Sequence, residues 1–463
     1  MTLLRPDPTF YPSPSSAASA PAEELAYVVT LNTDGQRPDA LVVVDTNPAS
    51  TTYGTLVGRL DMTESGDELH HFGWNACSSA LCPSAPHPHV ERRYLVIPGL
   101  RSSRIYVADT KPDPKNPKII KTIEPATLTA KTGYTRPHTV HCGPDGIYVG
   151  ALGNSEGDGP GGVLRLDHET FEPISAWEND RGGQYLAYDF WWHLNHDVMI
   201  TSEWGTPKMV EDGLQPSLLG QYGHQIHFWD LRKRNLTQTI DLGAEYQMVL
   251  ELRPAHNPNS LYGFVGVVVS TADLSASIWV WQKAGSNGAW EAKKVITIPA
   301  EPADPELLPP ALKPFGAVPP LVTDIDLSVD DKSLYVSCWG TGELQRYDVS
   351  DPLNPKKTGS VRLGGIVSKA KHPSGKGGEL NGGPQMVEIS RDGKRVYLTN
   401  SLYRAWDEQF YPEGVRGWIA KLDADANGGM SVDPNFFISF EGERPHQVRL
   451  QGGDASSDSY CFP

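Results

Sequence analysis

Short runs of apolar residues, most of them ending in Asp, recur along the whole chain. They alternate or continue in apolar residues over about five positions, as β-strands do, whereas helical periodicity is almost absent. The seven copies are Leu41–Asp45, Ile105–Asp109, Val163–Asp167, Ile226–Asp230, Ile278–Gln282, Leu344–Asp348 and Ile419–Asp423. Copies that recur at a loose but similar spacing predict a fold built from repeated strand units.

Each copy also has the same neighbours. A β-rich run follows it, and two further β-runs precede the next copy. Turn sequences such as Asp392-Gly393-Lys394 separate those two runs, as expected for a hairpin. Four strands in each of seven units predict an all-β fold, a seven-bladed β-propeller.

The two ends of the chain complete one blade. Only one good β-run, Ala26–Asn32, precedes the first copy, and one β-run, His446–Leu450, remains after the last outer strand. We therefore expect the C-terminal strand to become the innermost strand of the first blade, which closes the ring and removes two exposed sheet edges. Residues 1–24 read as a flexible N-terminal lead-in without the features of a signal peptide, and residues 25–463 as a single propeller domain.

Charge and cysteine content narrow the function classes. The chain has 40 basic and 56 acidic side chains, a net charge of −16, which disfavours nucleic acid and anionic membranes as partners. No apolar run is long enough to span a bilayer. Five cysteines in 463 residues argue against a disulfide framework and for a reducing compartment, so we expect a cytoplasmic protein.

Histidines fall at equivalent positions of three innermost strands. The starts of these strands align as Pro137-His-Thr-Val-His and Pro445-His-Gln-Val-Arg, with Leu69-His-His-Phe-Gly-Trp in the corresponding place of the second blade. His70 or His71, His138 and His446 should therefore meet at the water-accessible mouth of the central channel. Converging imidazoles suit copper, zinc, iron or nickel, and the pattern does not choose among them.

The remaining candidates depend on local geometry. His141 lies three residues beyond His138, so it faces the same side only if the strand is irregular, and otherwise it supports the ligands. Cys77 lies roughly 20 Å from His71 along an ideal strand, which favours a separate thiol site over a shared metal. Cys77 and Cys82 could equally be two reduced loop thiols. We expect His87, in a Pro-rich loop, and the histidines of the fourth blade to be structural or solvated.

Long stretches of the chain resemble the selenium-binding protein / methanethiol oxidase family. The matching runs include DELHHFGWNACSS (67–79), HTVHC (138–142), YDFWWHLNHDVMITSEWGTP (188–207) and the closing HQVRLQGGDASSD (446–458). The resemblance implies a WD40-like seven-bladed propeller and the copper-dependent oxidation of methanethiol by O2 and water to formaldehyde, hydrogen sulfide and hydrogen peroxide. It implies copper ligands among His70, His71, His138, His141 and His446, and a selenium-linked cysteine at Cys77.

Several hypotheses follow. In the first, an enzyme binds methanethiol as a thiolate at a histidine-held copper, O2 takes the electrons, and Glu203, Asp324 and Glu388 are candidates for proton transfer. In the second, a non-catalytic cytosolic propeller captures selenium or thiols at Cys77. A plain interaction platform and a propeller lactonase are weaker alternatives. A platform has no need of grouped histidines, and a lactonase would favour carboxylates and Asn around a hard divalent ion.

Overall fold

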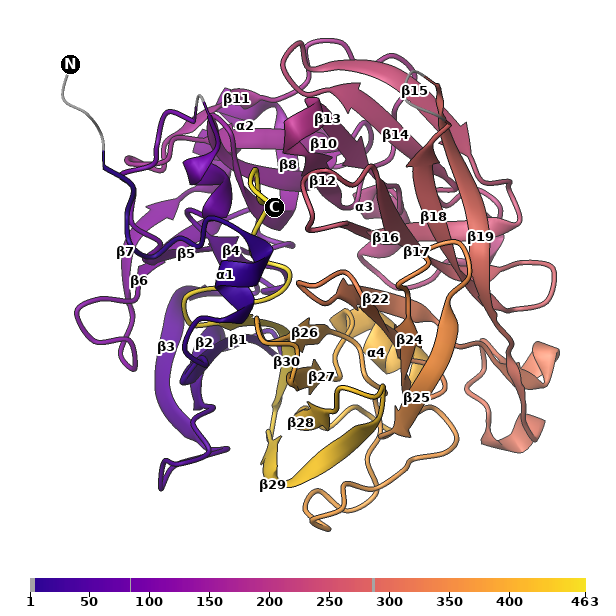
Figure 1. The fold of residues 1–463 in the computed structure, drawn as a ribbon. Helices are drawn as coiled ribbons and strands as arrows, with labels where there is room; N and C mark the ends of the chain where they lie inside the picture. Colours follow the sequence, from indigo (N-terminus) through magenta and orange to yellow (C-terminus); the bar gives the residue numbers. More distant parts are fainter. Residues whose placement is uncertain (1–4, 84, 285–287) are drawn as a thin grey trace.

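Seven four-stranded antiparallel sheets surround a central axis in the computed structural model, which describes residues 5–83, 85–284 and 288–463 (Figure 1). Innermost strand first, blades one to three consist of β30 Glu443–Leu450, β1 Leu25–Asn32, β2 Pro38–Asp45 and β3 Leu56–Ser65; β4 Gly73–Trp74, β5 Tyr94–Pro98, β6 Ile105–Asp109 and β7 Lys118–Ile123; and β8 Tyr134–Gly143, β9 Gly146–Asn154, β10 Gly162–Leu166 and β11 Pro173–Ala176.

Blades four to seven continue in the same order. They consist of β12 Phe190–His193, β13 Val198–Thr201, β14 Gln225–Asp230 and β15 Asn235–Asp241; β16 Tyr246–Pro254, β17 Tyr262–Ser270, β18 Ala276–Lys283 and β19 Trp290–Ile298; β22 Val322–Leu327, β23 Ser333–Cys338, β24 Glu343–Asp348 and β25 Lys356–Arg362; and β26 Val387–Ile389, β27 Arg395–Thr399, β28 Trp418–Ala424 and β29 Met430–Ser439. The predicted seven-bladed propeller is confirmed, and each recurring apolar run is the third strand of its blade.

Among the described residues, four short α-helices and one small hairpin lie outside the blades. They are α1 Pro14–Ala18, α2 Pro125–Thr132, α3 Pro207–Val210 and α4 Arg404–Phe410, with the hairpin of β20 Glu301–Pro302 and β21 Ala317–Val318. None of the described helices is both long enough and apolar enough to cross a membrane.

Burial falls from the innermost to the outermost strand of a blade. Every residue of β1 is buried, because both faces of the inner strands pack against neighbouring blades. The outer strand β3 instead alternates exposed and partly buried residues. The apolar clusters lie between blades: Tyr27 and Val43 of blade one pack with Leu95 and Ile97 of blade two in one such cluster.

The C-terminal strand closes the ring as expected. β30 pairs antiparallel with β1, with Ala26 opposite Leu450 and Val28 opposite Val448. The first blade is thus built from both ends of the chain, and the indigo and yellow strands lie side by side in Figure 1. This pairing brings His446 next to the segment that contains His70 and His71.

The N-terminal segment differs from the flexible lead-in that the sequence suggests. Residues 13–18 form a capped turn of helix, α1, and Ala17 packs into the core between blades six and seven. Phe10 is also buried, against Cys77 and Cys142. A few buried apolar side chains therefore anchor this segment to the propeller, although its overall composition is typical of disordered segments.

The C-terminal tail crosses the face of the propeller on which the N-terminal segment lies, and we call this face the tail face. Ser456 Oγ donates to Glu388, Ser459 Oγ accepts from Trp192 Nε1, and Asp458 accepts from the backbone of Ser78 at 2.6 Å. The tail thus contacts blades seven, four and two. Figure 1 shows it over the centre of the ring beside α1.

A disulfide joins this tail to blade two. Cys82 and Cys461 are bonded, across 379 residues of sequence, although the low cysteine count argued against a disulfide framework. Cys77, Cys142 and Cys338 are free and buried. The reading of Cys82 as a reduced loop thiol was therefore wrong.

The disulfide should stabilise the closed ring. Reducing it is expected to lower the free energy of unfolding by about 2–4 kcal/mol, because the crosslink restricts the unfolded chain. Thermal unfolding followed by circular dichroism with and without reductant tests this, with the C82S/C461S variant as the control. If reductant lowered the melting temperature of the wild type and of C82S/C461S equally, the disulfide would not be the cause, and this prediction would be contradicted.

Candidate metal centre

Three histidines converge at one end of the central channel. Ligand nitrogens of His70, His71 and His446 all lie within 4.8 Å of one another, and we call these residues the histidine cluster. The His70 and His446 rings are 3.7 Å apart between centroids. The segment before β4 carries the first two residues and β30 the third, and the backbone N–H of Phe72 donates to Gln447 Oε1 at 2.5 Å to hold the two together.

Most nitrogens of the cluster have no hydrogen-bond partner among the described residues. His70 Nδ1 and Nε2, His71 Nε2 and His446 Nε2 are buried without a hydrogen bond. Buried polar atoms are rarely left unpaired, so this set has the property expected of ligand atoms. His446 Nδ1 donates to the Ser401 carbonyl at 2.7 Å, which leaves the lone pair of Nε2 directed at the cluster, as in many metal-binding histidines. The residues fit a transition metal.

His138 lies beside the cluster. Its ring is 4.1 Å from that of His71, but its Nε2 shares a hydrogen bond of 2.8 Å with the Tyr403 hydroxyl. The structure thus brings together the predicted His70, His71, His138 and His446, with three of them converging and the fourth tied to a tyrosine. That His138 is a ligand stays a prediction.

His141 is further from the cluster. The β8 strand is irregular between Pro137 and Val140, the condition under which we expected His141 to reach the metal. Its ring nevertheless lies against that of Trp191, tilted by 43° with 3.9 Å between centroids, and its Nε2 lies 3.7 Å from Asp189 Oδ1. In the described part of the chain, its ring contacts are with aromatic residues and not with the other histidines.

Burial sets the charge state of the cluster. Each ring of the cluster is at most 2% exposed, so the site is enclosed and is not the open mouth that we expected. Desolvation, together with the neighbouring imidazoles, lowers the pKa of His70 and His71 well below the usual value, and desolvation lowers that of His446 to about 3. The imidazoles are therefore neutral at pH 7, which is the form that binds metals.

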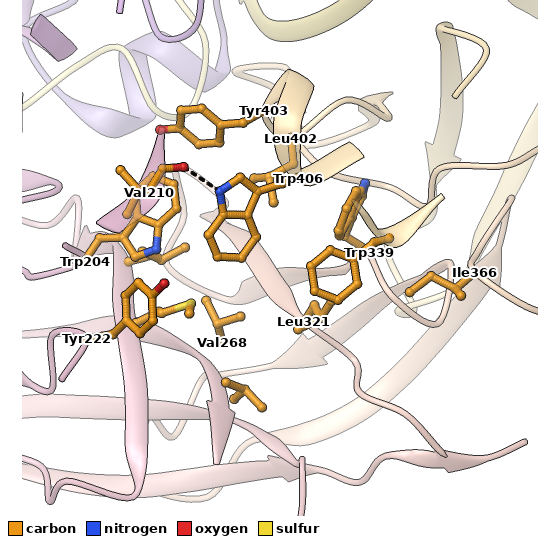
Figure 2. Packing of buried hydrophobic residues seen from close by; sticks show 14 of the residues in the cluster. Trp204, Val210, Tyr222, Val268, Leu321, Trp339, Ile366, Leu402, Tyr403 and Trp406 are labelled. Carbon is orange, nitrogen blue, oxygen red and sulfur yellow. Dashed lines mark hydrogen bonds between the residues drawn. The ribbon is translucent and has the colours of Figure 1, made fainter. Parts of the chain in front are cut away.

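An aromatic layer covers the cluster. Trp204, Tyr403 and Trp406 pack in one apolar group; Trp204 comes from the connection after β13, and Tyr403 and Trp406 from the connection after β27 (Figure 2). The Trp406 indole donates to the Val210 carbonyl at 2.8 Å and so ties α4 to α3. A cavity of about 20 Å³ remains in this layer, and its walls are almost entirely apolar.

The cavity adjoins the histidines through two tyrosines. Tyr188 and Tyr403 both line it. The Tyr188 ring is 4.8 Å from that of His138, and the Tyr403 ring stacks at 3.7 Å on that of His70. A very small, apolar molecule could therefore lie next to the imidazoles.

The three carboxylates predicted for proton transfer have other partners. Glu203 accepts from His227 at 2.9 Å, Asp324 from Arg253 at 3.2 Å, and Glu388 from Arg449 at 2.6 Å. Among the described residues, no hydrogen bond or ion pair joins these carboxylates to the cluster. Their part in proton transfer stays a prediction.

Glu251, which was not among the predicted carboxylates, is the one described carboxylate that lies within 4 Å of a cluster nitrogen. Its Oε1 lies 3.8 Å from His71 Nε2 and has no hydrogen-bond partner. Burial and the nearby Asp189 raise the pKa of Glu251 to about 8. The sequence did contain a signal that this segment is an innermost strand, because Gln247-Met-Val on β16 repeats the Gln385-Met-Val that starts blade seven. Tyr403, which follows β27 in a loop without a repeating pattern, gave no comparable signal.

Cys77 lies at the opposite end of the inner strands. It follows β4 on the tail face and is 3% exposed. Burial alone would raise the pKa of its thiol, but hydrogen bonds with Cys142 and Ser79 bring it below the usual value. Cys77 therefore does not share a site with the histidines, as its spacing predicted.

Comparison with known proteins gives the family. Residues 4–461 match the model of the 56 kDa selenium-binding protein (SBP56) family. The chain belongs to this family.

Relatives of the SBP56 family match almost the full chain. A Homo sapiens protein named methanethiol oxidase is 40% identical over 97% of both chains, and selenium-binding protein 2 of Mus musculus is 38% identical over the same share. The crystal structure of a hypothetical selenium-binding protein from Sulfolobus tokodaii is 59% identical, covers 99% of this chain and 100% of its own, and superposes with a TM-score of 0.96.

A network of buried charges beneath the cluster centres on Arg253. Its guanidinium is 3.1 Å from Glu251 and 3.2 Å from Asp324, with Asp189 and Asp326 also within 4 Å. Replacing Arg253 by Met leaves these carboxylates without a counter-ion. We expect the free energy of unfolding to fall by about 3–5 kcal/mol at alkaline pH, measured by urea denaturation.

The loss of unfolding free energy caused by R253M should be smaller in acid. Burial raises the pKa of Asp189 and Asp326 from 3.8 to about 6, so the folded protein keeps protons on them that the unfolded chain releases. Their contribution to stability therefore grows as the pH falls through about 6 towards the unfolded value. Arg232→Met, which breaks an exposed pair with Asp197, is the control and should leave the midpoint unchanged. An equal loss for R253M at all pH values would contradict this account.

Proposed function

We propose that this protein is a copper-dependent methanethiol oxidase. Methanethiol, O2 and water would give formaldehyde, hydrogen sulfide and hydrogen peroxide. The observation that carries the proposal is the convergence of His70, His71 and His446, with unpaired nitrogens, beside a small apolar cavity. The names of relatives about 40% identical over nearly the whole chain support the same activity.

Copper suits this ligand set. Imidazole binds copper well, and the sulfur of a thiol substrate adds the soft ligand that copper accepts, whereas hard ions prefer oxygen. When bound, copper would supply a centre that binds a thiolate and exchanges electrons with O2. The neutral state of the three imidazoles supports binding without a competing proton.

The aromatic layer suits a substrate with a single methyl group. A cavity of about 20 Å³ has room for only a few atoms, and its apolar walls would receive the methyl group of methanethiol. Tyr188 and Tyr403 line it next to the histidines, so the thiol end would point toward the cluster. Longer thiols would clash with Trp204 and Trp406, which predicts selectivity for the smallest thiols.

The surrounding residues orient the site and handle protons. The Ser401 carbonyl fixes the tautomer of His446, and Tyr403 holds the ring of His138 through its hydroxyl. Glu251 Oε1 lies 3.8 Å from His71 Nε2, and its raised pKa of about 8 lies close to neutral pH, so this carboxyl group is placed to exchange a proton with groups bound at the cluster. A cytoplasmic location remains part of the proposal and is not needed for the chemistry.

One observation favours the alternative of a non-catalytic propeller that binds selenium or thiols at Cys77. Hydrogen bonds lower the pKa of this thiol, and a thiolate is the reactive form of cysteine. The family model is named for selenium binding. The two functions use opposite ends of the inner strands, so single substitutions can separate them.

Removing one cluster ligand tests the oxidase. His446→Ala should lose bound copper and reduce methanethiol consumption by about 100-fold or more, because even residues that only support metal ligands contribute 10–100-fold. Copper content and coupled O2 uptake are measured on the purified, copper-loaded protein. His89→Ala, which removes a partly exposed histidine paired with Glu169, is the control.

The same assay separates the alternative. Cys77→Ser should keep its copper and its O2 uptake if the oxidase account is right. Two results together would favour the non-catalytic propeller instead. The wild-type protein would not oxidise methanethiol, and selenium uptake would be lost in C77S but kept in H446A.

The role of Glu251 can be compared with that of Glu203. Glu251→Gln removes the carboxylate beside His71 and should lower kcat by about 100-fold, within the range typical of general acid–base groups. Glu203→Gln is the matched control, because Glu203 bonds His227 and, among the described residues, makes no hydrogen bond or ion pair with the cluster. Equal losses in kcat at unchanged copper content would contradict the placement of the proton-transfer group at Glu251.

A further inference from the structure

A second group of metal-binding side chains lies at the other end of β8, on the tail face. His87, Cys142 and His168 offer ligand atoms that all lie within 4.8 Å of one another. They are 2%, 2% and 8% exposed. They come from the loop between β4 and β5, from the end of β8 and from the turn after β10, so three separate segments meet here.

The distances match those of a tetrahedral ion. Cys142 Sγ lies 3.4 Å from His87 Nε2 and 3.8 Å from His168 Nε2. A tetrahedral zinc ion has sulfur at about 2.3 Å and nitrogen at about 2.0–2.1 Å, which places its sulfur and nitrogen ligands about 3.5 Å from each other. Both sulfur–nitrogen distances are therefore already close to those of such a site.

The two imidazoles are available as ligands. Burial lowers the pKa of His87 to about 3 and that of His168 to about 4, so both rings are neutral. Their rings stack at 3.6 Å between centroids, and His87 Nδ1 is buried without a partner. A bound ion would require the rings to turn apart slightly so that both Nε2 atoms face it.

The fourth position of the site faces Ser79 and Cys77. Ser79 Oγ lies 3.8 Å from Cys142 Sγ, and the Cys77 thiol contacts both residues. Ser79 also lines a surface groove together with Pro86 and Asp145, which gives the site a path to solvent. Either water or the Cys77 thiol can complete the coordination.

We propose that His87, Cys142 and His168 form a zinc site. Two imidazoles and one thiolate without a carboxylate are a ligand set that zinc favours. The ion would clamp the loop after Cys82 to blade three, near the disulfide that anchors the tail. The site shares no residue with the histidine cluster, so the proposal stands independently of the oxidase function.

Cobalt(II) titration of the full-length protein tests the site, because a cobalt–thiolate bond gives a near-ultraviolet charge-transfer band that histidine-only sites lack. We expect the band to saturate at one equivalent of cobalt and to be removed by one equivalent of zinc. Binding should release a proton, since the Cys142 thiol must ionise to become a ligand. The H446A variant should keep the band in full.

Ligand variants decide the outcome. C142S and H168Q should lose the band, with H168Q, at the most exposed of the three positions, expected to fold as the wild type does by circular dichroism. H89Q, in the same loop as His87, is the matched control and should keep it. No band in the wild type, or a band unchanged in both C142S and H168Q, would overturn the zinc site. A band lost in H446A would show that the signal depends on the histidine cluster and would equally overturn the proposal.

Discussion

The pairing of β30 with β1 is the constraint on which the rest of the structure depends. It places the last strand of the chain inside the first blade, with Val448 opposite Val28. His446 thereby comes within reach of His70 and His71, and the bond between Phe72 and Gln447 spans 375 residues of sequence. A propeller left open at this point would have two unpaired edges and no complete histidine cluster.

Desolvation then determines what the closed channel can do. The aromatic layer of Trp204, Tyr403 and Trp406 shields the imidazoles from water, which keeps them neutral and leaves their lone pairs free. Below them, Arg253 and Arg449 compensate the buried carboxylates that would otherwise be too costly to enclose. The apolar layer and the charged network thus lie on either side of the histidine cluster.

Much of the fold could be read from the sequence, because a repeat presents the same pattern seven times. The third strand of every blade, the ring closure and the proximity of four histidines all follow from aligned strands. The disulfide could not be read in this way, since Cys82 and Cys461 are 379 residues apart and belong to no repeated position. The packing of α1 was missed because composition averages over the few side chains, such as Ala17, that become buried.

The chemistry around the histidines was predicted less completely for a similar reason. Tyr403 and Trp204 lie in long connections, whose course depends on contacts between blades and not on local periodicity. His168 lies in a turn after β10 and meets His87 and Cys142 only through the fold. Strand alignment identifies residues that project into the channel, but it does not show which of them meet at one point.

A crystal structure of the copper-loaded protein, with anomalous diffraction data collected at the copper edge, tests directly whether the histidine cluster holds copper. We expect an anomalous peak at bonding distance from nitrogens of His70, His71 and His446, beneath Tyr403. The absence of a peak at that position in crystals whose protein contains stoichiometric copper would contradict it.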